Sequence, residues 1–370
     1  MKTIVTKDEL MKGLQMVVPI VGNKISLPVL SNFLFEAKDQ KIKLTATDLE
    51  TSIECFIKGE IIEDGEITIP AKKFAEIVKE ITEENIEIKT TDNNINIKTK
   101  KSKFTLTGMD VKDFPKLPEY DTKNTIMLNT KNLVSMFSKT LFAVSKDMQR
   151  FVITGEYMVM ENGKLEIVST DGKRLAYIGL NDIDKNATGK AIIPTKAVAD
   201  FCKIVSLNSA IANVNLSISD NLATFVINDI VFQTKLIEGV FPNYKQVMPK
   251  NNLSSIKLNV QETLTAVKQA ALFANNLLTG STGAIKMSFE NNKMKVSAQS
   301  SNTGSGEIET DIEYSGEKFA ILFNPNYIKD VLQNIEDENV VLSYNNPTSP
   351  VTFSPEKNSD YICVVMPMKE

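Results

Sequence analysis

Apolar residues recur with helical spacing at three widely separated places in the chain. In each place they fall at positions i, i+3, i+4 and i+7, which brings them to one face of an α-helix. Each pattern opens at a proline (Pro70, Pro194 or Pro325), and proline is favoured in the first turn of a helix. The apolar positions are Phe74, Ile77, Val78 and Ile81, then Val198, Phe201, Cys202 and Val205, then Ile328, Val331, Leu332 and Ile335. Because the copies are about one domain length apart, we predict three related domains in series.

A second helix is predicted at an equivalent position in each domain. Its apolar stripe is Leu10, Leu14, Val17 and Val18, then Leu133, Phe137, Leu141 and Val144, then Leu264, Val267, Ala271 and Ala274. Most of the remaining sequence alternates apolar and polar residues around short turns, which is typical of antiparallel hairpins. The clearest hairpins are residues 86–98, 214–227 and 340–353. The pattern therefore predicts an α+β fold dominated by antiparallel sheet.

Polar stretches that contain proline separate the domains. Residues 118–124 and 249–255 follow the pairs Phe114-Pro115 and Phe241-Pro242, so they are predicted to be linkers. The predicted domains are 1–122, 123–250 and 251–370.

The amino-acid composition argues against a membrane protein and against an enzyme or metal site that depends on histidine. The chain has 370 residues, 42% of them hydrophobic, which suits folded cores, and no apolar run approaches the length of a membrane span. It has no histidine, so the commonest general base and imidazole metal ligand are missing. The three cysteines are scattered, and the first residues lack the apolar core of a signal peptide. We expect a cytoplasmic protein with reduced thiols.

Lysines stand on the polar side of the proline-opened helices. The first helix has Lys72 and Lys79 opposite its apolar stripe, and the second has Lys196 and Lys203 at the same two positions. A solvated helix face is the simpler explanation for either helix alone, whereas the repeat favours a shared role. Because Glu76 and Asp200 interrupt the lysines, a polyanion would be held loosely and without sequence preference.

Arginine is rare enough to be informative. Nearly every basic residue is lysine, and Arg150 and Arg174 are the only arginines. Arg174 lies in a predicted turn, and Arg150 comes directly before the predicted strand 151–153. Two explanations account equally well for this usage. One is codon bias; the other is that both sites need the planar guanidinium fork, which lysine cannot supply.

Several segments together resemble a known family. They are residues 28–32 (PVLSN), 45–50 (TATDLE), 169–175 (STDGKRL), 241–244 (FPNY) and 364–368 (VVMPM), and the resemblance extends in order from Met1 to Glu370. The family is that of the bacterial sliding clamps, the β subunits of DNA polymerase III. The resemblance implies that each domain has two helices and two antiparallel sheets. It also implies that two chains pair head to tail in a six-domain ring around duplex DNA, with no catalysis and no cofactor.

The resemblance also implies three sets of site residues. A groove for a partner peptide rich in Gln, Leu and Phe would comprise Ile153, Thr170, Gly172, Lys173, Arg174, Leu175, Pro242, Val247, Leu278, Asn324, Tyr327, Thr348, Pro350, Val364, Val365, Met366, Pro367 and Met368. DNA contacts would come from Lys24, Gln149, Arg150 and Phe151, together with Lys72, Lys79, Lys196 and Lys203. The dimer interface would comprise Lys73, Phe104, Leu106, Leu272, Phe273 and Glu307.

The implied partners are all parts of DNA replication and repair. They are double-stranded DNA without sequence preference, a second copy of the chain, the DNA polymerase III α subunit, the clamp loader, and other polymerases, ligase and mismatch-repair proteins that carry a clamp-binding peptide. No membrane partner is implied, and the expected location is the cytoplasm, at the nucleoid and replisome. Lys173, Leu278 and Gln246 depart from residues common in the family, so the preferred peptide stays open.

Two other function classes remain as alternatives. A nucleotide-handling enzyme could use the loop 280–283 to hold phosphate, but no GK[ST] follows it, and residues 284–286 continue as a strand rather than a helix. A tandem adhesion module rich in β-structure would be monomeric and extended, and would not need helices with lysine faces.

Overall fold

The computed structural model describes residues 1–22, 27–121, 125–208, 211–248, 254–274, 283–300 and 304–369. Within it the chain forms two compact units. Unit 1 is Met1–Val134 with Ile193–Glu238, and unit 2 is Ser135–Ile192 with Gly239–Glu370.

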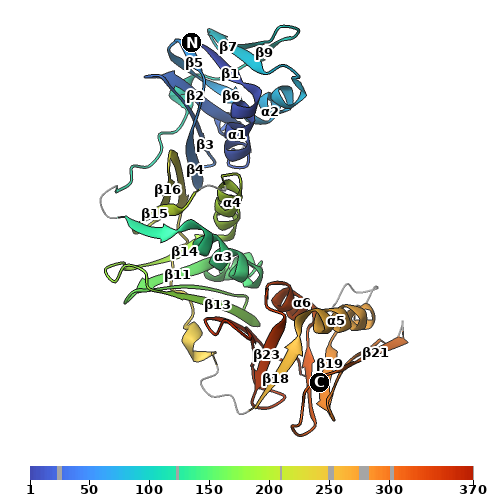
Figure 1. Cartoon of the computed structure of the whole chain (residues 1–370). Coiled ribbons are helices and arrows are strands. Elements are labelled where there is room, and N and C mark those ends of the chain that lie inside the picture. The colour runs from blue at the N-terminus through green and yellow to red at the C-terminus, as the bar shows by residue number, and fades with distance from the viewer. Residues whose placement is uncertain are drawn as a thin grey trace. The chain divides into compact units, whose positions relative to one another are not determined.

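Unit 1 is built on two antiparallel sheets. The smaller has the order β5-β1-β7-β8-β9, and the larger has the order β10-β15-β16-β17-β4-β3-β2-β6. The strands are β1 (Lys2–Thr6), β2 (Asn32–Lys38), β3 (Lys41–Thr47), β4 (Thr51–Ile57), β5 (Glu60–Glu63), β6 (Gly65–Pro70), β7 (Asn85–Thr91), β8 (Asn94–Lys98), β9 (Lys103–Thr107), β10 (Ile126–Asn129), β15 (Asn213–Ile218), β16 (Leu222–Ile227) and β17 (Ile230–Lys235). Helices α1 (Lys7–Val17) and α2 (Ala71–Glu80) pack side by side, and α4 (Thr195–Ser206) belongs to the same unit (Figure 1).

Unit 2 repeats this plan. Its sheets have the orders β14-β11-β12-β13-β25-β24-β23-β18 and β21-β20-β19-β22. The strands are β11 (Gly155–Glu161), β12 (Lys164–Thr170), β13 (Arg174–Asn181), β14 (Gly189–Pro194), β18 (Ser254–Asn259), β19 (Ile285–Glu290), β20 (Lys293–Ser300), β21 (Gly304–Asp311), β22 (Phe319–Phe323), β23 (Asn339–Tyr344), β24 (Val351–Pro355) and β25 (Tyr361–Val365). Helices α5 (Val260–Ala274) and α6 (Pro325–Gln333) pack together, and α3 (Thr130–Thr140) precedes β11 in the chain.

The predicted threefold repetition is confirmed by the topology. Each repeat has two helices, one set of strands ordered as β10-β15-β16-β17, and a second set ordered as β14-β11-β12-β13. The eight-stranded sheets arise because the end strand of the second set in one repeat pairs with the end strand of the first set in the next repeat. These joints are β4 with β17 and β13 with β25, and both are antiparallel. The three hairpins expected from sequence are also present.

The joint between β4 and β17 contains a buried amide. Gln233 is 2% exposed and accepts a hydrogen bond from Ser52 on β4 at 3.2 Å. Its Nε2 donates to the carbonyl oxygen of Pro118 at 3.1 Å and lies 3.3 Å from Thr224 Oγ1 on β16. One side chain therefore connects two repeats and the segment that runs between them.

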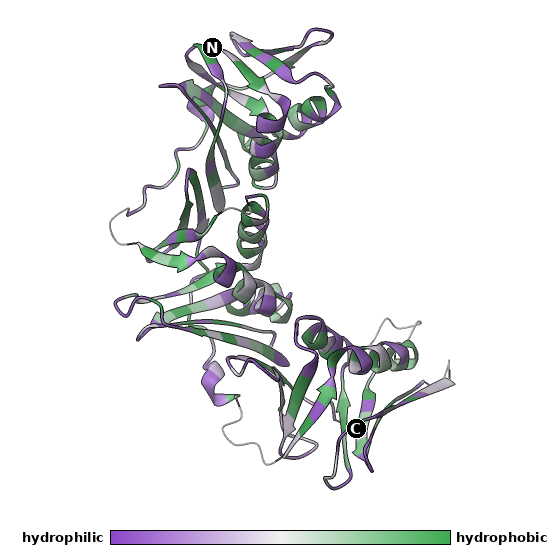
Figure 2. Ribbon diagram, viewed as in Figure 1, coloured by the Kyte–Doolittle hydropathy of each residue, from purple (hydrophilic) through white to green (hydrophobic). Residues whose placement is uncertain are grey.

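The helical stripes are buried with a few differences. Phe74, Val78, Phe201 and every predicted position of α6 and its following turn are buried, and apolar residues of both large sheets line the cores (Figure 2). The prediction was wrong for Cys202, which is half-buried, because Ala197 and Ile204 point inward beside Phe201 and complete the stripe. Ile77, Val205 and Val18 are likewise only partly covered.

Three predicted boundaries were wrong. Helix α3 ends at Thr140, and Leu141 begins a 3₁₀ turn, because the Thr140 hydroxyl bonds back to the carbonyls of Met136 and Phe137. Residues 148–153 form 3₁₀ turns on either side of a kink at Arg150 rather than a strand, and the Asp147 side chain caps the first turn by accepting a hydrogen bond from the Gln149 amide. Residues 254–255 belong to β18 rather than to a linker, because they pair with β23.

Lys7 joins the two helices of the first repeat. Its Nζ donates hydrogen bonds to the carbonyl oxygens of Lys79, at 2.9 Å, and Ile81. These carbonyls lie at the C-terminal end of α2, where helix carbonyls lack partners and a positive charge is favourable. A lysine at the start of α1 therefore caps the end of α2.

Candidate functional site

Unit 2 holds a small apolar pocket of about 150 Å³. The residues that line it are Arg150, Ile153, Thr170, Gly172, Lys173, Arg174, Leu175, Pro242, Asn243, Tyr244, Val247, Val364 and Met366. Most of these belong to the set that the sequence resemblance assigned to the partner peptide. The structure thus brings the turn after β12, the segment 241–247 and the end of β25 to one cavity.

The turn that precedes β13 is held rigidly. Asp171 accepts hydrogen bonds from the backbone amides of Lys173 and Arg174, and the Thr170 hydroxyl accepts one from Gly172. Gly172 has a φ of 85°, a left-handed conformation that suits glycine. A Cβ there would also lie 2.5 Å from the guanidinium of Arg150, so glycine leaves room for that side chain.

Arg174 is occupied by contacts within the chain. Its guanidinium bonds to the carboxylates of Asp171 and Asp330 and to the carbonyl oxygen of Phe142. It also lies over the ring of Tyr327, 4.7 Å from the ring centroid. With its side chain 10% exposed, Arg174 shapes the pocket chiefly by fixing its neighbours.

The other predicted groove residues are not among those that line the pocket, or fall outside the described residues. Asn324 accepts a hydrogen bond from the Asn326 amide and caps α6, and Tyr327 covers Arg174. Thr348 is tied to Asn346 in a turn. Pro350, Val365, Pro367 and Met368 do not line the cavity, while the Met366 amide bonds to the Lys173 carbonyl. Leu278 lies outside the described residues.

Sequence reasoning missed the pocket role of Asn243 and Tyr244, and it assigned Arg150 to DNA alone. Arg150 lines the pocket and donates a hydrogen bond to the Asp171 carbonyl at 3.0 Å. Gln149 and Phe151, the neighbours predicted to contact DNA, are exposed, and Phe151 is 51% exposed. The FPNY segment could have signalled Tyr244, but its contact with the strands depends on residues far away in sequence.

The lysines of α2 and α4 that were predicted to contact DNA are exposed, and Lys196 lies between two carboxylates. Lys196 lies 3.0 Å from Asp200 and 3.3 Å from Asp48. Burial lowers the pKa of Lys196, but the two carboxylates outweigh it, and the net pKa is raised. Lys72, Lys79 and Lys203 are exposed on their helices, and Lys24 lies outside the described residues.

Each unit ends in an open sheet edge with apolar side chains. Strand β9 pairs only with β8 in the described chain, and its Phe104 is 36% exposed. Strand β21 pairs only with β20 in the described chain, and beside it Leu272 on α5 is 72% exposed. These values exclude a core role for Phe104 and Leu272. Leu106 and Phe273 are half-buried.

The two open edges carry opposite charges. Residues 98–103 contain four lysines, whereas β21 carries Glu307, Glu309 and Asp311. Within the chain, Lys73 pairs with Glu76, and Glu307 pairs with Lys295 at 3.0 Å. The edges are therefore complementary in both charge and hydrophobicity.

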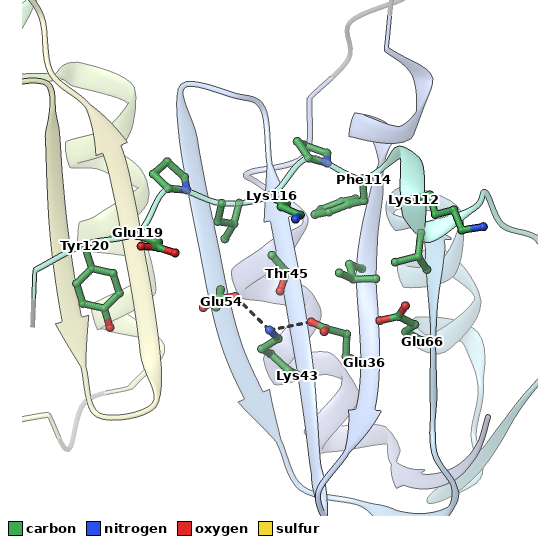
Figure 3. Close-up of a pocket in the computed structure, with 15 residues that line it drawn as sticks. Glu36, Lys43, Thr45, Glu54, Glu66, Lys112, Phe114, Lys116, Glu119 and Tyr120 are labelled. Carbon is green, nitrogen blue, oxygen red and sulfur yellow. Dashed lines mark hydrogen bonds and ion pairs between the residues drawn. The ribbon is translucent and has the colours of Figure 1, made fainter.

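Unit 1 has a wider cavity, of about 690 Å³, beneath the segment 111–120. Figure 3 shows this segment crossing the sheet, with Phe114 directed toward the strands. On the floor, Lys43 lies between Glu36, at 2.9 Å, and Glu54, at 3.3 Å (Figure 3). Lys43 therefore joins two carboxylates of this floor.

Neither a membrane-spanning helix nor a metal-binding cluster occurs among the described residues. No helix there is both long and apolar enough to cross a membrane. No group of three or more Cys, Asp or Glu side chains in the same residues is placed to hold a metal ion.

Comparison with known proteins gives matches over the whole chain. Residues 1–118, 127–243 and 245–369 match the N-terminal, central and C-terminal domains of the DNA polymerase III beta subunit. The beta sliding clamp of Chlamydia pneumoniae is 34% identical over 371 residues, covering 100% of this chain and 99% of that protein. The clamp of Chlamydia muridarum is 32% identical with the same coverage.

Solved structures agree with these matches. A sliding clamp of Pseudomonas aeruginosa bound to griselimycin is 28% identical, with a TM-score of 0.94 and 100% coverage of both chains. The beta subunit of Streptococcus pyogenes DNA polymerase is 25% identical, with the same TM-score and coverage.

Proposed function

Since the chain belongs to the DNA polymerase III beta subunit family, the beta sliding clamps, we propose that two copies close head to tail around duplex DNA. The chain is a processivity factor of DNA replication. A clamp holds its polymerase near the primer end at high effective concentration, so processivity rises without new chemistry. The family is non-catalytic, and the proposed location is the cytoplasm, at the replisome.

The observation that best supports a ring is the way in which strands at the sheet edges pair between repeats. In each internal joint, the end strand of the second set of one repeat pairs antiparallel with the end strand of the first set of the following repeat, as β4 does with β17. By the same rule, β21 ends the second set of the third repeat and lacks its partner in the described chain, while β9 ends the first set of the first repeat and is also unpaired on that side there. A second copy supplies that strand, which satisfies both open edges. Phe104 and Leu106 would then meet Leu272 and Phe273, with Lys73 near Glu307.

Light scattering with size-exclusion chromatography tests this interface. Leu272→Asp should convert the dimer to a monomer, because it places an unpaired charge in an apolar contact. Met127→Asp is a matched control, since Met127 is 66% exposed and lies on β10, away from both open edges. A dimer that survives Leu272→Asp at micromolar concentration would refute the edge pairing.

Duplex DNA is the proposed occupant of the ring. Enclosure needs only weak phosphate contacts, which suits exposed lysines such as Lys72, Lys79 and Lys203. Lys196 is expected to contribute less, because its acidic partners offset its charge. Lys24, Gln149, Arg150 and Phe151 remain proposed contacts. A clamp loaded on circular DNA should stay bound and leave when the DNA is linearised; equal retention on both forms would contradict enclosure.

Partner proteins are proposed to bind the pocket of unit 2 through a short peptide. Its apolar lining and flexible Met366 suit Leu and Phe side chains from different partners. Candidate partners are the DNA polymerase III α subunit, the clamp loader, other polymerases, ligase and mismatch-repair proteins. Val247→Asp should weaken binding of a fluorescent Gln/Leu/Phe peptide, whereas Val240→Asp, at an exposed position outside the lining, should not. Equal affinities would refute the site.

A further inference from the structure

The segment 241–247 forms one wall of the pocket in unit 2, and a nearly buried carboxylate fastens it to the sheet. Tyr244 donates a hydrogen bond to Glu166 Oε2 at 2.5 Å. Tyr177 on β13 donates to Glu166 Oε1 at 2.8 Å. The Glu166 side chain, on β12, is 11% exposed. Both oxygens of one carboxylate are therefore used, one by the wall and one by the sheet.

Aromatic contacts hold the other end of the same wall. Phe241 stacks on Tyr157 of β11, with ring centroids 4.7 Å apart and planes 10° apart. Tyr244 meets the same ring edge-on at 6.3 Å. Pro242 lies between these two anchors and, with Val247 just beyond them, lines the cavity. The position of the wall thus depends on how Phe241 and Tyr244 are seated.

The charges around Glu166 keep it ionised. Lys164 lies 3.3 Å and Lys245 3.6 Å from its carboxylate. Burial raises the pKa of Glu166, but hydrogen bonds from Tyr244, Tyr177 and Lys164 outweigh it, and the net pKa is lowered. At neutral pH the ionised carboxylate accepts a hydrogen bond from each phenol, and hydrogen bonds to a charged acceptor are stronger than neutral ones.

We propose that Glu166 is a positioning residue for peptide binding: through Tyr244 it holds the 241–247 wall at the spacing that the pocket requires. The proposal rests on the peptide-binding function proposed above. Glu166 does not line the cavity, so its effect on a ligand must pass through the wall. A loose wall would have to be ordered at the moment of binding, and that ordering weakens affinity.

Peptide affinity provides the first test. Fluorescence anisotropy with a fluorescein-labelled Gln/Leu/Phe peptide should show binding weakened on the order of 10-fold by Tyr244→Phe and by Glu166→Gln. The double variant should bind no more weakly than the weaker single variant, because both changes remove the same contact. Tyr314→Phe is the matched control. It removes a buried hydroxyl that bonds to Tyr344 and Glu317 away from the pocket, and affinity should stay within about twofold of the unaltered protein.

Hydrogen exchange provides a readout that global destabilisation would not reproduce. Residues 239–248 should take up deuterium several-fold faster in Tyr244→Phe and Glu166→Gln, and at an unchanged rate in Tyr314→Phe. Unchanged exchange of this segment, or equal loss of affinity in the Tyr314→Phe control, would overturn the inference. If the unaltered protein binds no peptide, the proposed function fails, and exchange alone then decides whether Glu166 fastens the wall.

Discussion

Arg174 should contribute more to stability than any other cation near the pocket. Its guanidinium bonds to Asp171, Asp330 and the Phe142 carbonyl, and it lies over the Tyr327 ring. Removing one member of a mostly buried ion pair costs about 3–5 kcal/mol, because the remaining carboxylate is left uncompensated. The Asp330 side chain is 37% exposed, so solvent compensates it better for the lost guanidinium than it compensates Asp171, whose side chain is 18% exposed. We therefore expect Arg174→Ala to lower the free energy of unfolding by about 3–4 kcal/mol.

The variant Arg174→Lys distinguishes the contribution of the positive charge to stability from that of the planar guanidinium. Lysine keeps the charge but cannot reach both carboxylates or stack in the same plane, so a loss of about 2 kcal/mol is expected. Urea unfolding followed by far-UV circular dichroism at pH 7 measures both changes, since the chain has no tryptophan. Lys173→Ala, at the exposed neighbouring position, should stay within about 0.5 kcal/mol of the unaltered protein. A change below about 1 kcal/mol in Arg174→Ala would refute this account of Arg174.

Three further predictions concern individual side chains. Burial raises the pKa of Glu156 well above 4.5, so its stabilising contribution is complete at low pH and is lost as pH rises through the folded pKa. Glu156→Gln should therefore raise the melting temperature at pH 8 but not at pH 4.5; equal shifts would contradict this. Lys7→Met should cost about 1 kcal/mol in urea unfolding by uncapping α2, whereas Lys12→Met should cost less. Burial raises the pKa of the Cys55 and Cys363 thiols to about 12, so a disulfide reagent should modify half-buried Cys202 first in the native protein.

Most of the fold could be predicted from the repeated pattern of apolar residues. Apolar spacing located α2, α4 and α6, and alternation located the hairpins, because both are local consequences of which side chains must be buried. Local signals failed where a capping side chain decided the outcome. Residues 151–153 look like a strand, but 3₁₀ turns cover 148–153, and the Asp147 side chain caps the first of them.

The site was less accessible to sequence reasoning. Resemblance placed Leu175, Val247 and Val364 together, and they do line one pocket. It gave no indication of Glu166, whose role depends on contacts with Tyr177 and Tyr244 from elsewhere in the chain. Such a network has no sequence period, because its members are brought together only when β12, β13 and the 241–247 segment are in place.

The joint between β4 and β17 has a practical consequence for anyone who dissects this chain. A fragment that stops at the first domain boundary would leave β4 with unpaired backbone groups. It would also lack Gln233, which accepts a hydrogen bond from the Ser52 hydroxyl. Exposed strand edges recruit other chains, so such a fragment is expected to aggregate even though its own apolar core is complete. A truncation that retains both strands should remain in solution.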